Sequence, residues 1–195
     1  MDSRQLALIS NFETKIAVVE ALDDLMKTTD ISKITVGNIC ERARISRATF
    51  YRCFTNKLAV TQWFLDYVHS LGTDKIGRTL SWQKGYYITE EAIVENLDFF
   101  TNAAKASDYN APDMYAPRKR KERLVETLVE VHGLELTERL KFQIDVVVEV
   151  ETRLLPRWHY GEYGVSLDEI TRWVADAVPR ELFEILNTPP RKENR

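Results

Sequence analysis

The sequence predicts an all-α protein in which a small N-terminal domain of short helices is followed by a larger helical bundle. Apolar residues recur at helical spacing along most of the 195-residue chain. Hydroxyl and amide side chains precede these apolar series, where they can accept hydrogen bonds from the first free amides of a helix. Only seven glycines and six prolines interrupt the pattern, so long irregular segments are not expected.

The N-terminal domain, residues 1–56, is predicted to contain three helices. The stretch "SNFE" at Ser10–Glu13 is typical of a capping box and predicts a helix over about 11–28. Further polar residues are suitable caps for the helices that follow: Thr35 for about 36–43, Ser46 for about 47–53, and Thr55 or Asn56 for about 57–71. The last of these helices begins the second domain.

The second domain, residues 57–187, is predicted to have longer helices. They are expected over about 89–106, 118–131 and 136–155, with a last helix that starts at Ser166 and that Pro179 should kink or restart. Ser166 begins a second capping box, "SLDE", and Gly133 is a suitable helix C-cap. Residues 188–195 are expected to form a flexible tail.

Positive charge is concentrated in the first domain, although the whole chain carries a formal net charge of −3. Residues 1–58 hold nine basic and seven acidic side chains. From Lys33 to Lys57 there are six basic residues and one carboxylate, Glu41. A local basic patch on an acidic protein indicates a polyanionic partner such as nucleic acid, and a solvated helical face is the alternative.

Several other classes of protein are not indicated. No apolar stretch approaches the roughly 20 residues that span a bilayer, and the N-terminus lacks a secretory signal pattern, so we expect a cytoplasmic protein with no membrane partner. Cys40 and Cys53 are predicted to be reduced core residues. His69, His132 and His159 show no metal-ligand spacing, and neither a metal nor a cofactor is expected.

The segment 36–53 has the proportions of a helix-turn-helix motif, with two short helices joined by a tight turn. With Ser46 as N-cap, Arg47, Ala48 and Thr49 form the first turn of the second helix, which a recognition helix inserts into the major groove. Arginine can pair with guanine, and the methyl groups of alanine and threonine can contact a thymine methyl. This helix is therefore a candidate for reading DNA sequence.

The rest of the same helix is predicted to have an inner and an outer side. Phe50 and Phe54 are four residues apart and are expected to face the core. Tyr51 and Arg52 then lie outside, where a phenol and a guanidinium can reach DNA phosphates. The helix would be anchored by its aromatic side and would present polar groups to the duplex.

The stretch "ITVGNICERARISRATFYRCFTNKLAV", residues 34–60, resembles the DNA-binding signature of the tetracycline-repressor (TetR) family. The likeness lies in the hydroxyl of Thr35, the series S-x-x-T-x-Y that starts at Ser46, and Lys57 after an aromatic residue. The resemblance implies phosphate contacts from Thr35 and Lys57, and Lys57 would share its phosphate with the free amides of the helix that it begins. The segment 157–182 also resembles the C-terminal pattern of a branch related to dihydroxyacetone-kinase regulators.

Arg44 departs from the family pattern, which usually has glycine in the turn between the two helices. If the position keeps a positive φ, a residue other than glycine costs roughly 1 kcal/mol. Arg44 could then add a phosphate contact, or the turn could adopt another shape and shift the second helix. A tolerated surface arginine is the other interpretation.

The resemblance implies that the larger domain forms a homodimer through its last two long helices, about 136–157 and 167–186. It also implies a pocket for an unidentified small-molecule effector. The candidate lining residues are aromatic: Phe64, Tyr67, Phe99, Phe100 and Phe142. The alternative is that these aromatic residues simply pack as core. The helix over about 57–71 would transmit effector binding to the DNA-binding domain.

The predicted function is a homodimeric transcriptional regulator that represses by binding a palindromic operator on double-stranded DNA and is released by its effector. One alternative is a co-regulator of the same fold that acts through protein contacts. A helical-bundle enzyme is a second alternative, for which Asp145 and Glu149 are the only suggestive pair. The run "RKRKER" at 118–123 is predicted to be a solvated face.

Overall fold

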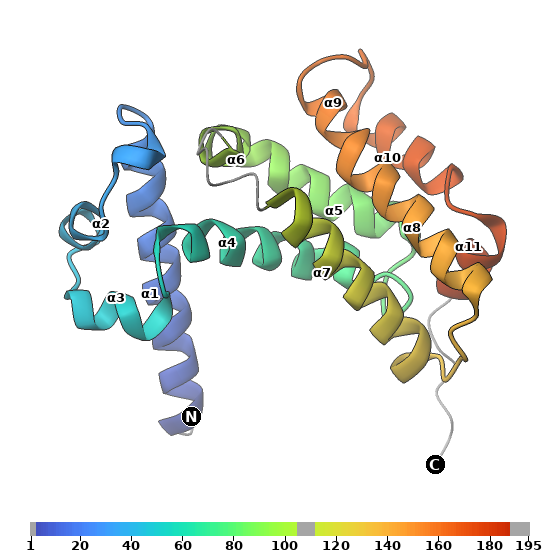
Figure 1. Cartoon of the computed structure of the whole chain (residues 1–195), viewed down its shortest axis with the longest axis horizontal. Helices are drawn as coiled ribbons and strands as arrows, with labels where there is room; N and C mark the ends of the chain where they lie inside the picture. The colour runs from blue at the N-terminus through green and yellow to red at the C-terminus, as the bar shows by residue number, and fades with distance from the viewer. Residues whose placement is uncertain (1–2, 105–111, 188–195) are drawn as a thin grey trace. The chain divides into compact units, whose positions relative to one another are not determined.

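The computed structural model describes residues 3–104 and 112–187, and its regular structure is helical (Figure 1). Within these two ranges there is no strand, only an isolated bridge between Ile76 and Leu80. The predicted all-α fold is confirmed. The predicted tail, 188–195, lies outside the described residues. None of the described helices combines the length and the apolar character needed to cross a bilayer.

The N-terminal helices follow the predicted caps. Their bounds are α1 Ser3–Met26, the 3-10 turn η1 Ile31–Lys33, α2 Val36–Arg42, α3 Arg47–Cys53 and α4 Lys57–Leu71. Thr35 and Asn38 form a capping box at α2, because each side chain accepts a hydrogen bond from the other residue's main-chain amide. Asn56 caps α4 by accepting from the Ala59 amide at 2.9 Å.

The predicted start of α1 is wrong. The helix begins at Ser3, so the series Ser10–Glu13 lies inside it and is not a capping box. The Thr14 hydroxyl instead donates to the Ser10 carbonyl at 2.7 Å, a bond typical of a helix interior. The residues before Ser10 are mostly good helix formers, and the helix continues through them.

The chain divides into two compact units. The first contains the described residues up to Tyr67 together with α6, Leu97–Ala104. The second contains residues 68–95 and the described residues from Pro112 onward. The helix α4 therefore begins in the first unit and ends in the second. The predicted functional boundary between residues 56 and 57 stays a prediction.

The second unit is built from the remaining helices. They are η2 Thr73–Lys75, α5 Trp82–Glu95, α7 Pro112–Glu126, the π-helical turn η4 Thr127–Val131, α8 Glu138–Arg153, α9 Leu155–His159, α10 Leu167–Asp176 and α11 Arg180–Leu186. Fully buried side chains from several of them form one core, which includes Trp82, Tyr86, Leu128, Val148 and Leu182. Aromatic and branched side chains thus fill the centre of this unit.

Two helix ends of the second unit confirm the sequence signals, and one contradicts them. Ser166 and Glu169 form the predicted capping box, and Pro179 is the N-cap of α11. Thr89 does not begin a helix. It is buried inside α5, which starts at Trp82 because the aromatic residues of its first turns pack into the core.

The main chain comes unusually close to itself where α5 meets the end of α4. A Cβ atom added to Gly72 would lie 2.3 Å from the carbonyl oxygen of Gly85, and one added to Gly85 would lie 2.3 Å from the Ile76 side chain. The Thr89 hydroxyl accepts a hydrogen bond from the Thr73 amide at 2.8 Å in the same region. Only glycine fits at these two positions.

Candidate nucleic-acid interface

The turn between α2 and α3 has the geometry that the sequence left open. Arg44 has φ 55°, the only positive φ among the described residues other than glycine. Its amide donates to the Glu41 carbonyl at 3.2 Å, and the Ile45 amide donates to the Cys40 carbonyl at 3.0 Å. These two bonds form a Schellman motif, in which the left-handed residue is usually glycine. The turn therefore keeps its shape with Arg44, at the cost of backbone strain.

The helix α3 is held by its inner side, as predicted. Phe50 and Phe54 are buried, and their rings lie 5.8 Å apart. Tyr51 is 57% exposed, and Arg52 is exposed beside it. The apolar anchor thus leaves the opposite side of a seven-residue helix free for a partner.

The first turn of α3 is exposed and free of carboxylates. Ser46 caps it by accepting from the Thr49 amide at 3.0 Å, and the two hydroxyls are 2.9 Å apart. Arg47 and Ala48 are exposed, and Thr49 is half-buried. The side-chain tip of Arg47 lies near the start of α2, because a Cβ atom on Gly37 would be 3.0 Å from its Nη2 atom. The guanidinium therefore lies against the N-terminal end of α2.

The basic residues of this patch differ in whether they already form an ion pair within the protein. Arg44, Arg47 and Arg52 are exposed and form no ion pair with any described residue. Arg42 is different, since its guanidinium pairs with Asp24. Hydrogen bonds from Lys27 and Arg42 lower the pKa of Asp24 to about 2, so this carboxylate stays charged.

Two predicted phosphate contacts are already engaged within the protein. The Thr35 hydroxyl donates to the side-chain amide oxygen of Asn38, Oδ1, at 2.6 Å beside its capping box. The Lys57 ammonium donates to three main-chain carbonyls, at 2.6 to 2.9 Å. An ammonium has three donors, so Lys57 would have to give up one of these bonds to contact a phosphate. Thr35 would have to exchange Asn38 for a phosphate.

Four of the five predicted effector residues lie together in the first unit. Phe64 stacks on Phe100 with ring centroids 5.4 Å apart and meets Phe99 edge-on at 5.0 Å. Tyr67 stacks on Trp63 at 5.7 Å. These rings fill each other's contact surfaces, so the cluster is a packed core in this structure.

Phe142 does not belong to this cluster. It lies on α8 in the second unit and is 68% exposed, so the structure does not bring it together with the other four, and its role in a pocket stays a prediction. The helical period of α8 places Phe142 on the outer side with charged residues. Sequence alone could not distinguish this outer position from an inner one, because α8 carries apolar residues on both sides.

A buried charged network in the second unit was missed by the sequence analysis. Arg120 donates to Glu151 through Nε at 2.8 Å and Nη2 at 3.0 Å, and to the Thr73 carbonyl at 3.0 Å. The Tyr86 hydroxyl also donates to Glu151, at 2.8 Å. Burial, together with the charge of Glu151, raises the pKa of Tyr86 well above its usual range. The phenol therefore remains a donor.

The prediction that 118–123 is a solvated face is wrong for Arg120, although Arg118 is exposed. A signal was present, since Arg120 precedes buried Leu124 and Leu128 at intervals of four residues and shares their side of the helix. Charge concealed this periodicity, because a run of basic residues is usually solvated.

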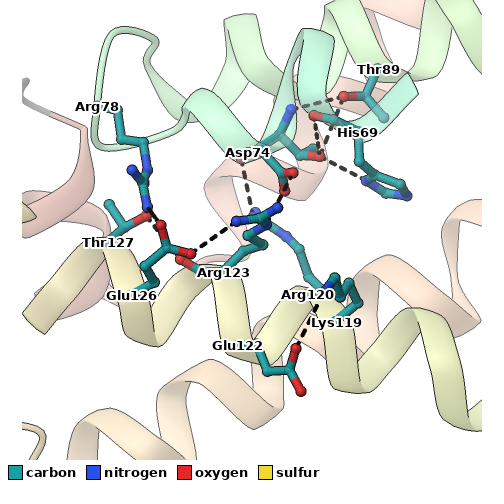
Figure 2. Close-up of polar contacts among 11 residues, drawn as sticks. His69, Asp74, Arg78, Thr89, Lys119, Arg120, Glu122, Arg123, Glu126 and Thr127 are labelled. Carbon is teal, nitrogen blue, oxygen red and sulfur yellow. Dashed lines mark hydrogen bonds and ion pairs between the residues drawn. The ribbon is translucent and has the colours of Figure 1, made fainter. Parts of the chain in front are cut away.

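Further polar contacts lie along α7 and the segment after α4 (Figure 2). Arg78 bonds to Glu126 at 2.8 Å and to the Thr127 hydroxyl at 3.0 Å, at the start of the π-helical turn η4. Arg123 bonds to Glu126 at 3.0 Å and approaches Asp74 at 3.5 Å. These pairs connect α7 to the segment after α4.

The histidines also take structural positions in the second unit. The Nδ1 atom of His69 lies 2.8 Å from the Thr73 hydroxyl, and His159 lies 2.7 Å from buried Glu90. His132 lies 2.6 Å from the Gly77 carbonyl. Each ring thus has a partner in the fold.

The pair that suggested an enzyme does not form a site. Asp145 binds Lys121 at 2.6 Å, and Glu149 binds Arg153 at 2.5 Å. Both carboxylates are more than half exposed. They are charged residues on the solvent-exposed side of α8, so they give no support to acid or base catalysis.

The outer side of α8 is less apolar than its sequence indicates. Val147 and Val148 are buried within the second unit. Phe142 remains as the exposed large apolar residue of α8, and Trp173, 51% exposed, is its counterpart on α10.

Comparison with known proteins adds a likeness of fold. No family model matches the sequence, and no curated protein sequence matches it. Among solved structures, the chain is similar to the dihydroxyacetone kinase operon activator DhaS, with a TM-score of 0.61 and 16% identity. The similarity covers 90% of this chain and 98% of that chain. At this identity it shows the fold alone, an arrangement of helices that the two chains share.

Proposed function

We propose that the protein is a DNA-binding transcriptional regulator that reads double-stranded DNA with α3. The observation that carries this proposal is the distribution of charged side chains on the helix-turn-helix. Three exposed arginines, Arg44, Arg47 and Arg52, lie on or beside a helix that contains no carboxylate and is anchored by buried phenylalanines. The TetR-like fold supports the proposal, because it places such a motif before a larger helical domain.

Each side chain has a separate proposed role. Arg47, Ala48 and Thr49 contact base edges from the first turn of α3. Arg44, Tyr51 and Arg52 contact phosphates, which position the helix but carry no sequence information themselves. Ser46 is a helix cap that keeps the first turn in place, and its hydroxyl is directed to Thr49.

The active species is proposed to be a homodimer that binds a palindrome. A two-fold dimer presents two copies of α3, and a palindromic operator offers two matching half-sites. The dimer contact is proposed to use the outer sides of α8 and α10, where Phe142 and Trp173 are exposed. Burying both aromatics against a second copy would remove apolar surface from water.

The sequence resemblance predicts a repressor that a small molecule releases, whereas the similar protein DhaS is an operon activator. We keep repression as the proposal. A promoter fused to a reporter, with and without the regulator gene, measures the sign directly: expression should rise when the gene is deleted. A fall on deletion would make the protein an activator.

Selection of genomic fragments by the purified protein tests DNA binding. Fragments that survive repeated rounds should share a palindrome and shift in a gel at nanomolar protein, with affinity that falls steeply as salt rises. Arg44→Ala with Arg52→Ala should abolish the shift while circular dichroism shows an intact fold. If no fragment is enriched over random DNA, the protein acts through another partner, as the co-regulator alternative requires.

Binding of a small-molecule effector is also proposed, and the packing of the aromatic cluster restricts where the effector could bind. A ligand at Phe64 and Tyr67 would have to displace packed rings, and a thermal-shift screen with small apolar metabolites would detect one. Tyr67→Ala should then abolish the shift, and Tyr160→Ala is the matched control because that ring is exposed in the second unit and lies outside the proposed dimer contact. Hits that stabilise Tyr67→Ala as well as they stabilise the parent protein would place the site elsewhere.

A further inference from the structure

Lys57, the first residue of α4, binds the main chain of the segment between α1 and α2. Its Nζ atom lies 2.6 Å from the carbonyl oxygen of Ile31, 2.9 Å from that of Ser32 and 2.8 Å from that of Ile34. The three hydrogen bonds use all three protons of the ammonium. We call this arrangement the Lys57 clamp.

The electrostatics of the two helical elements explain the clamp. The N-terminal end of α4 carries partial positive charge, which is unfavourable for a cation such as Lys57. The C-terminal end of η1 exposes carbonyl oxygens, which are favourable for one. The amides of α4 have their own cap in Asn56. The lysine is therefore stabilised by η1 and not by the helix to which it belongs.

The clamped segment leads directly into the DNA-reading helices. Ile31 and Ile34 are 1% and 2% exposed, so the segment is anchored in the core at both ends. Thr35, the N-cap of α2, follows at once. The clamp therefore fixes where α2 begins relative to the start of α4, and the Schellman turn at Arg44 extends that placement to α3.

We infer that Lys57 is a positioning residue for DNA binding and not a phosphate ligand. It holds α2 and α3 at the angle that the groove requires. This inference rests on the proposed function, since it assigns a role within DNA recognition. The existence of the clamp can nevertheless be tested without DNA.

The first test compares Lys57→Met with Lys33→Met. Lys33 lies in the same segment and is exposed, and its ammonium makes no hydrogen bond or ion pair with a described residue, so both variants lose one charge but only one loses the clamp. Lys57→Met should lower the Tm by about 3 °C or more, and Lys33→Met should leave it within about 1 °C. Exchange of the Ile34 amide, which donates to Ile31, should accelerate about tenfold in Lys57→Met only.

The second test measures DNA binding by anisotropy over a salt series, at a temperature where each variant is fully folded. The probe is a labelled duplex carrying the best fragment from the genomic selection. Lys57→Met should weaken binding about tenfold with the log–log salt slope unchanged, because no phosphate contact is lost. Arg52→Met is the control for a phosphate ligand and should reduce the slope.

Each contrary result has one meaning. A slope reduced in Lys57→Met as it is in Arg52→Met would make Lys57 a phosphate ligand and overturn the inference. A lower Tm with unchanged DNA affinity would confine the clamp to stability and also overturn it. An unchanged Tm and unchanged amide exchange would disprove the clamp itself. If the parent protein binds no fragment, the proposed function fails, and the first test still decides whether the clamp exists.

Discussion

Arg120 and Glu151 form a two-pronged ion pair, in which Nε and Nη2 of the guanidinium lie 2.8 and 3.0 Å from the two carboxylate oxygens, with side chains only 4% and 8% exposed. The third arm of the guanidinium binds the Thr73 carbonyl, and Tyr86 binds the same carboxylate. The network connects α5, α7 and α8 to η2, and each of its charges is compensated.

Removing one partner of this pair should be severe. Arg120→Met leaves the Glu151 carboxylate buried without its cation, and we expect a loss of about 3 to 5 kcal/mol in the free energy of unfolding. Urea denaturation followed by circular dichroism measures it. Lys121→Met, on the same helix, breaks an exposed pair with Asp145 and should cost less than about 1 kcal/mol. Equal losses in the two variants would contradict the buried role.

Replacing Arg44 by glycine should have opposite effects on stability and on DNA binding. Glycine adopts a φ of 55° without strain, so Arg44→Gly should gain about 1 kcal/mol in the free energy of unfolding. The same change removes a proposed phosphate contact and should weaken binding to all sequences. Arg44→Ala is the control, since it loses the charge and keeps the strain. A stability gain in the alanine variant as well would mean that the charge, and not φ, is responsible.

Arg47 and Arg52 should differ in what they contribute to DNA binding. Arg47→Ala should remove the preference at one base pair of each half-site, a loss of about 1 to 3 kcal/mol of discrimination. Arg52→Ala should weaken all sequences alike and reduce the salt slope by about one unit per subunit. Competition assays with single-base operator variants separate the two effects. Unchanged base preferences in Arg47→Ala would remove it from base readout.

Two substitutions on α8 separate folding from dimerisation. Val147→Asp places a charge in the core of the second unit and should unfold that unit. Phe142→Glu changes an exposed position and should yield a folded monomer by light scattering at micromolar protein. Val129→Glu, an exposed apolar residue outside the proposed contact, should remain dimeric. A dimeric Phe142→Glu would place the contact on another surface.

Acid should weaken the protein through His69. Burial, and then the charge of Arg120, lowers the pKa of His69 below its usual 6.5. Between that lowered pKa and 6.5 the unfolded chain binds more protons than the folded one, so stability is complete above pH 6.5 and falls as the pH decreases through this window. His69→Gln should flatten the curve of unfolding free energy against pH. Parallel curves for the two proteins would show that other groups cause the acid sensitivity.

The sequence predicted the helix-turn-helix almost to the residue, because its information is local. Thr35, Ser46 and Asn56 cap their helices through hydrogen bonds that span three residues, and Phe50 and Phe54 face inward by helical spacing alone. These signals do not depend on distant parts of the chain. The positive φ at Arg44 was an open alternative that the structure decided.

The sequence could not predict the contacts that join residues distant along the chain. Lys57 has the position expected of a phosphate ligand, but its partners lie 23 to 26 residues earlier. Arg120 belongs to a basic run, yet its partner is 31 residues later. The sequence around Phe142 did not show whether its side chain lies on the buried or the exposed side of α8. Polar pairing over such distances cannot be inferred from periodicity.

The main chain itself sets the distance between α5 and the end of α4 where Gly72 contacts Gly85. Elsewhere in the second unit, the distance between helices depends on the volumes of the side chains between them, and a change in one can be absorbed by another. No side chain at these two positions sets the distance, because none is present. The distance between the main chain at Gly72 and at Gly85 can therefore stay constant when the side chains around the two glycines are substituted.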